Sequence, residues 1–271
     1  MAEKRRLPRI SFWKALALVL LLLFFDAVLK YSSGLGQNNS AEKIIIEYAS
    51  QNGFTLDDYP MDIRDMLVRN DETKQFVTEY PKKITHFEPE KPNLSEYKDC
   101  KEPPQLMQWD MRWGYMTYNG NVFGLTGSAP TCLSMAALYV LHNPELSPVY
   151  IAEYAKRSNC EGRPEILLSS GARAMGMNVS EVMRNNQRLR EAVTEEGCTV
   201  ICMLKDQELS QFIVIKGIDK EGHFVINDPF SKKLSSTGYA FVDLNKNIKR
   251  IWKYSPAVSD TKVTTGTQTN P

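Results

Sequence analysis

Apolar residues change their spacing along the chain near position 199. Before it they recur at helical spacing, and after it they form short runs rich in valine, isoleucine and aromatic residues. The spacing predicts helices over residues 41–51, 60–80, 131–141, 165–176 and 186–196. Strands are predicted over residues 199–204, 212–219, 223–228 and 248–254. Helices followed by an antiparallel sheet indicate an α+β fold.

The helix predicted over residues 131–141 carries almost no polar side chains. Such a helix is expected to be central and buried. Gly53 and Gly176 follow two of the predicted helices and are expected to end them. Residues 219–222, with the sequence DKEG, predict a hairpin turn between two strands. The central helix and the sheet together define a main domain over residues 105–254.

The segments on either side of the main domain differ from it in composition. Residues 40–104 are predicted to form a helical lead-in and then a connector, because residues 81–104 are rich in proline, lysine and glutamate. Residues 255–271 are rich in serine and threonine and offer no apolar core positions. A disordered tail is therefore predicted there.

The N-terminus predicts a membrane anchor. An apolar run of eleven residues, 15–25, follows four basic residues, Lys4, Arg5, Arg6 and Arg9. With its flanks the run spans a bilayer core of about 30 Å, so a transmembrane helix is predicted over residues 12–30. The basic segment 1–11 would stay in the cytoplasm and the rest of the chain outside. Two alternatives stay open: a signal peptide cleaved near residues 32–34, giving a secreted protein, and a buried soluble helix.

Charge and cysteine content narrow the range of partners. Lys and Arg total 33 against 32 Asp and Glu, a formal charge of +1, which gives no support to nucleic-acid binding. The three histidines and five cysteines lack the spacing of metal ligands, so no metal or other cofactor is expected. Cys198 and Cys202 lie about 13 Å apart on one predicted strand, too far for a disulfide. The sequence leaves open a disulfide that involves Cys100.

Three motifs stand in a fixed order: QWDMRWGY from Gln108, GSAPTCLSM from Gly127, and QFIVIKGI from Gln211 followed by FVINDP up to Pro229. This ordered set resembles the papain-like cysteine peptidases of the bacteriocin-leader-processing type, in their stand-alone form. The resemblance covers roughly residues 60–254. It implies a papain-like fold, in which a central buried helix packs on an antiparallel sheet.

The resemblance also implies a role for four positions, two of which have lost the residue that reacts. Gln108 falls on the family's oxyanion-hole glutamine and Asp228 on the aspartate that orients the catalytic histidine. Ser128 stands at the position of the nucleophilic cysteine, and Gln211 stands at the position of the histidine. The chain therefore resembles a degenerate member of the family. Taken alone, Ser128 is also a plausible helix cap and Asp228 a turn residue.

A serine facing a glutamine cannot perform the family's reaction. A hydroxyl is a poor nucleophile unless a base removes its proton, and the Gln211 amide is not basic. Losing the nucleophile or the histidine of a serine protease costs about 10⁶-fold in turnover. His142 is predicted about 15 Å from Cys132 along one helix, and His223 about 23 Å from the Gln211 position along the sheet. His86 in the connector is the remaining candidate base.

The sequence therefore predicts a pseudopeptidase, with no functional catalytic residue, that binds a peptide or protein partner outside the cell membrane. One alternative is an active hydrolase whose base is relocated to His86. Another is a scaffold whose cleft is filled by its own segment 81–104.

Overall fold

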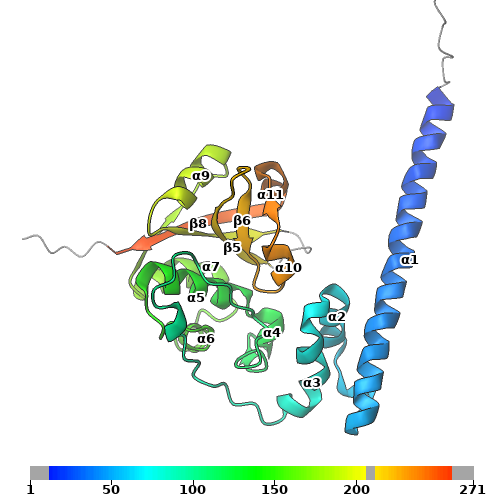
Figure 1. The fold of residues 1–271 in the computed structure, drawn as a ribbon, viewed down its shortest axis with the longest axis horizontal. Coiled ribbons are helices and arrows are strands. Elements are labelled where there is room, and N and C mark those ends of the chain that lie inside the picture. Colours follow the sequence, from blue (N-terminus) through cyan, green and yellow to red (C-terminus); the bar gives the residue numbers. More distant parts are fainter. Residues whose placement is uncertain (1–11, 206–210, 258–271) are drawn as a thin grey trace, which may run out of the picture. The chain divides into compact units, whose positions relative to one another are not determined.

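The structure, a computed structural model, describes residues 12–205 and 211–257. It divides into two compact units, Met1–Arg69 and Asn70–Pro271, which are described separately below (Figure 1). The predicted basic segment 1–11 and most of the predicted tail lie outside the described residues.

The first unit is built on one long helix. Helix α1 (Phe12–Asn52) ends at Gly53, which has a φ of 76°, and is followed by η1 (Leu56–Asp58) and α2 (Met61–Arg69). One face of α1 packs on α2 through buried apolar side chains: Ala41, Ile45 and Ala49 on α1, and Ile63, Met66 and Leu67 on α2. The helix predicted over residues 41–51 was too short, because α1 continues without a break through the polar stretch before it.

The N-terminal half of α1 exposes large apolar side chains. Those whose exposure is described are Leu16, Val19, Leu20, Leu21, Leu23 and Phe24. In the described part of the chain, no helix combines the length and the apolar content that a bilayer crossing requires.

The second unit is organised around an antiparallel sheet with the strand order β3-β8-β4-β5-β6-β7. The strands are β3 (Met177–Glu181), β4 (Thr199–Leu204), β5 (Phe212–Ile218), β6 (Phe224–Asn227), β7 (Gly238–Tyr239) and β8 (Ile248–Pro256). The predicted α+β class is confirmed. The hairpin turn between β5 and β6 is also confirmed, because the Gly222 N–H donates to the Asp219 carbonyl and Gly222 has a φ of 83°.

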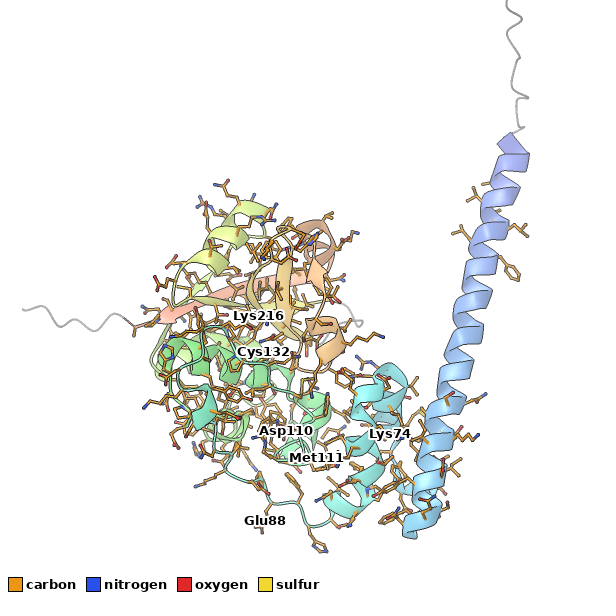
Figure 2. The ribbon with its side chains drawn as sticks, viewed as in Figure 1. Lys74, Glu88, Asp110, Met111, Cys132 and Lys216 are labelled. Atoms are coloured by element: carbon orange, nitrogen blue, oxygen red, sulfur yellow. The ribbon has the colours of Figure 1, made fainter. Side chains whose placement is uncertain are left out.

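Helices cover both faces of this sheet (Figure 1). Helix α5 (Ser128–Leu141) packs on the face formed by Ile201, Met203, Phe212 and Val214. Helices α9 (Asn186–Thr194) and α11 (Phe241–Asn247) cover the opposite face, formed by Val200, Cys202, Ile213 and Ile215. Alternate residues of each strand thus enter different cores, as a pleated strand requires. The buried central helix is confirmed, with Cys132 about one turn from its N-terminus (Figure 2).

Several helices depart from the prediction, and the helix predicted over residues 60–80 is divided into α2 and α3 by η2. Helix α3 (Lys74–Ile84) runs through Pro81, which forgoes one backbone hydrogen bond near the end of the helix. Helix α6 (Pro148–Arg157) was not predicted, although Ser147 caps it by accepting from the Tyr150 N–H at 3.2 Å.

Leu167–Gly171 (η4) is π-helical between α7 (Pro164–Ile166) and α8 (Ala172–Ala174). The remaining short elements are η2 (Asp71–Thr73), η3 (Ser95–Tyr97), β1 (Thr117–Tyr118), β2 (Asn121–Val122), α4 (Phe123–Thr126) and α10 (Lys232–Ser235).

The connector, residues 85–104, lies against the main domain. Its Leu94 is buried in the same core as α5. Further along, the Cys100 Sγ lies 3.7 Å from the Leu138 carbonyl oxygen, and Glu102 pairs with Lys216 at 2.7 Å. The Pro103 carbonyl accepts from the Asn227 side chain at 2.7 Å. The connector therefore passes along α5 and reaches the end of β6.

Candidate functional site

Ser128 is the first residue of α5 and is 7% exposed. The helix cap is Gly127, so the alternative role of Ser128 as the cap is wrong. A Cβ at Gly127 would lie 2.4 Å from the Phe123 ring and 2.6 Å from the Phe123 carbonyl oxygen. The turn into α5 therefore requires glycine at position 127, and this turn places Ser128 at the positive end of the helix dipole.

Gln108 lies in the same network as the start of α5. It is 4% exposed, and its Nε2 donates to the Gly124 carbonyl at 2.7 Å, while its Oε1 is buried and has no hydrogen-bond partner among the described residues. Its backbone N–H donates to the Pro229 carbonyl at 2.8 Å. One of the two N–H donors of the Gln108 side-chain amide is thus bonded to Gly124.

Asp228 follows β6 and is 0% exposed. Its Oδ1 accepts from the backbone N–H of Phe230 at 2.7 Å and of Ser231 at 3.3 Å. Its own N–H donates to the Ser235 Oγ at 2.8 Å. These bonds shape the turn between β6 and α10. Of the two roles that the sequence allowed for Asp228, they correspond to that of a turn residue.

Gln211 is exposed and stands immediately before β5. Its carbonyl accepts from the Leu204 N–H at 2.9 Å, and the Leu204 side chain lies in the core under α9 and α11. The next residue, Phe212, is the one that packs on the α5 side. Gln108 thus bonds to Gly124, four residues before Ser128, and to Pro229, next to Asp228, whereas the bond described for Gln211 is the one to Leu204.

The three histidines occupy other parts of the fold. His142 is the C-cap of α5, in the left-handed conformation with a φ of 51°, at the opposite end of the 14-residue helix from Ser128. That separation is about 20 Å. His223 lies in the β5–β6 hairpin, where its Nδ1 is 3.4 Å from an Asp219 carboxylate oxygen. His86 is exposed just beyond α3.

All five cysteines are free thiols. Burial, followed by the nearby Asp228 carboxylate, raises the pKa of the Cys132 thiol well above its usual value. Burial also raises the pKa of Cys202, and burial together with Glu195 raises the pKa of Cys198 to about 11. Because the thiolate is the reactive form, the buried Cys132 is expected to be a poor nucleophile.

A thiol reagent such as Ellman's reagent should therefore react slowly with the native protein at neutral pH. Cys100, which is half-buried, should react first, and the other four should react only as the chain unfolds. After denaturation all five should titrate at the rate of an ordinary thiol. Mass spectrometry of the partially labelled protein would identify the sites, and rapid native labelling of Cys132 would contradict its burial.

One contact with the site was not predicted from the sequence. Asn70 Nδ2 donates to the Phe230 carbonyl at 2.6 Å, and Glu72 Oε2 accepts from the Lys232 N–H at 2.8 Å. The start of the second unit thus holds the turn that follows Asp228. About 160 residues separate the partners, and no local sequence pattern reports a contact over that separation.

No group of three or more His, Cys, Asp or Glu side chains that could hold a metal occurs in the parts of the chain that the structure describes. Family models, curated proteins and solved structures were all compared with the chain, and none of them matches it. The resemblance to papain-like peptidases therefore remains a prediction from the three motifs.

Proposed function

We propose that this chain is a pseudopeptidase: a papain-like domain that binds a peptide or protein segment near the start of α5 without cutting it. Residues 12–30 would hold it in the cell membrane, with the main domain outside the cytoplasm. The proposal rests on the ordered motifs and on the arrangement of the residues that those motifs place at the site.

The arrangement around α5 supports the architectural part of the proposal. A buried helix on an antiparallel sheet carries Ser128 at its N-terminus. Gln108 bonds to Gly124, four residues before Ser128, and to Pro229, next to Asp228. These two bonds of Gln108, to residues near Ser128 and Asp228 in the sequence, are consistent with a shared site.

The observation that carries the functional part is the lack of a base for Ser128. None of the three histidines makes a hydrogen bond with Ser128 in the described structure, and Gln211 offers an amide instead of an imidazole. Without a base the hydroxyl keeps its proton, and the loss amounts to about 10⁶-fold in turnover in a serine protease. A bound peptide is therefore expected to leave the site intact.

The test measures hydrolysis of peptide libraries by the purified full chain, followed by mass spectrometry of the products. The parent protein should release no more product than buffer. The Ser128→Cys, Gln211→His double variant, with Ser128→Cys as its matched control, reports whether the remaining site can still act. Hydrolysis by the parent that disappears in Ser128→Ala would refute the proposal, and its loss in His86→Ala would instead establish the relocated base.

A second candidate function is a scaffold whose cleft is filled by its own connector. The contacts of Cys100, Glu102 and Pro103 with α5, β5 and β6 favour this alternative, because they place part of the connector along the central helix. The two functions differ in whether the region near Ser128 is open to another molecule. A structure of the chain with a bound peptide would distinguish them.

A further inference from the structure

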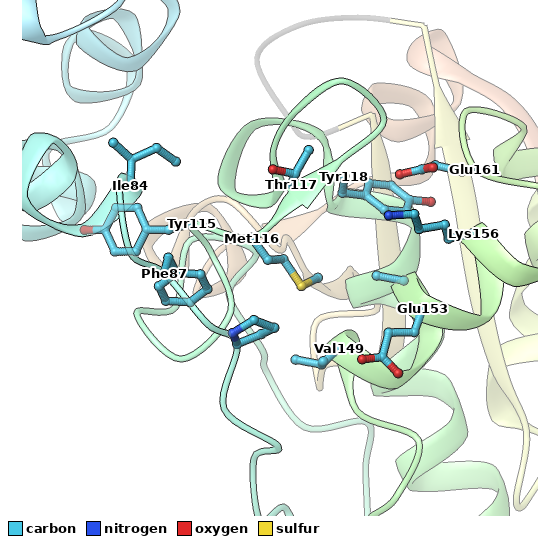
Figure 3. A pocket seen from close by; sticks show the side chains of 12 residues that line it. Ile84, Phe87, Tyr115, Met116, Thr117, Tyr118, Val149, Glu153, Lys156 and Glu161 are labelled. Atoms are coloured by element: carbon cyan, nitrogen blue, oxygen red, sulfur yellow. The ribbon is translucent and has the colours of Figure 1, made fainter.

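A pocket of about 260 Å³ lies within the second unit, apart from the four positions discussed above (Figure 3). Its walls come from the segment after α3, from residues 115–118 and from α6. None of Gln108, Ser128, Gln211 and Asp228 lines it. What it binds is therefore a separate question from whether the chain cuts peptides.

The walls of the pocket are mainly apolar and aromatic. Phe87, Met116, Tyr118 and Val149 contribute its apolar surface. In Figure 3, Ile84, Tyr115 and Phe87 lie toward one end, and Tyr118, Lys156 and Glu161 lie toward the other. The pocket thus has an apolar end and a charged end, which suits a ligand with an apolar body and one charged group.

The charged end favours a cation. Glu161 is held in place, because its Oε1 accepts from the Asn119 backbone N–H at 2.7 Å. Glu153 also lines the pocket and shares an exposed ion pair with Arg157 at 3.4 Å. Lys156 is the single basic side chain of the lining, so the carboxylates outnumber the ammonium groups.

We propose that this pocket binds an amphipathic primary amine, with its apolar body against Phe87, Met116 and Tyr118 and its ammonium on Glu161. Two sources share this chemistry: a free aromatic amine, and the N-terminal residue of a peptide that begins with a large apolar side chain. A carboxylate ligand is disfavoured at the charged end, because it would lie beside the Glu161 carboxylate, which is fixed by its bond to Asn119. A pre-positioned carboxylate forms a charge-assisted hydrogen bond with an ammonium donor, which is stronger than a neutral one.

Isothermal titration of the full chain with four related probes tests the proposal. Phenethylamine represents the free amine and phenylalanyl-alanine amide the peptide N-terminus, while the N-acetylated dipeptide amide and 3-phenylpropionate remove or reverse the charge. At least one of the two amines should bind about tenfold more tightly than both uncharged and acidic probes. The amine that binds identifies the source of the ligand.

Glu161→Gln should weaken amine binding about tenfold, whereas Glu145→Gln, an exposed glutamate outside the pocket, should leave it unchanged. Lys156→Met leaves the Asn119–Glu161 bond intact and removes the like charge, so it should strengthen amine binding. The proposal would be overturned if no probe bound, or if 3-phenylpropionate bound as tightly as phenethylamine. It would also be overturned by unchanged amine binding in Glu161→Gln or by weaker amine binding in Lys156→Met. Each of these failures would leave the hydrolysis test of the proposed function unaffected.

Discussion

Replacing Phe76 with alanine is expected to destabilise the second unit by about 3–5 kcal/mol. Phe76 is 1% exposed, and its ring stacks on Tyr115 with the ring centres 4.3 Å apart. Two glycines lie against the ring: a Cβ at Gly124 would come within 2.6 Å of it, and a Cβ at Gly114 within 2.7 Å. Because backbone and stacked ring surround Phe76, the cavity left by alanine cannot close without moving several segments.

Urea unfolding followed by tryptophan fluorescence would measure this effect. Gln75→Ala, an exposed change on the same helix, is the matched control and should cost well under 1 kcal/mol. The loss of stability in Phe76→Leu should fall between those of Phe76→Ala and Gln75→Ala, because leucine fills part of the space of the ring. A loss for Phe76→Ala no larger than that of the control would show that the ring does not fix α3 to the main domain.

The same change should reach the candidate site. Gly124, which contacts the Phe76 ring, supplies the carbonyl to which Gln108 Nε2 donates. Collapse around position 76 would therefore disturb Gln108 before it disturbs the sheet. The packing of Phe76 and the position of Gln108 therefore depend on each other, although 32 residues separate them in the sequence.

Strands buried on both faces were predictable from the sequence. β4 matches the predicted range 199–204, because all of its residues are buried and those from Val200 to Leu204 enter one or the other of the two cores with apolar side chains. The edge strand β3, with the sequence MNVSE, was missed, since its polar residues give no strand signal and only pairing with β8 makes it a strand. Edge strands depend on a partner that local spacing does not reveal.

For the site, the sequence predicted which positions to examine but not the bonds that they make. Asp228 and Gln108 bind backbone groups that their neighbours supply, and those bonds depend on how the turn after β6 meets the segment before α4. Gln211 was predicted beside Ser128 through the resemblance alone. The backbone bond between Gln211 and Leu204 depends on how β4 and β5 pair. The spacing of apolar residues does not predict this pairing at the ends of the two strands.

Asp228→Ala is expected to lower the free energy of unfolding by about 3 kcal/mol or more. The substitution would leave the buried N–H groups of Phe230 and Ser231 without the acceptor that Asp228 Oδ1 provides. Asp228→Asn keeps an oxygen in that place and should cost about 1 kcal/mol. Asp99→Ala, an exposed aspartate in the connector, serves as the control and should be close to neutral.

The difference between alanine and asparagine at position 228 separates the two roles of this aspartate. A structural role requires only an acceptor for the two N–H groups, so asparagine should preserve most of the melting temperature and alanine should not. A carboxylate kept to orient a histidine would differ in this respect, since the resemblance puts Gln211 at the position of that histidine. If alanine proved as stable as asparagine, the turn would not need Asp228, and the search for a partner of its charge would have to begin again.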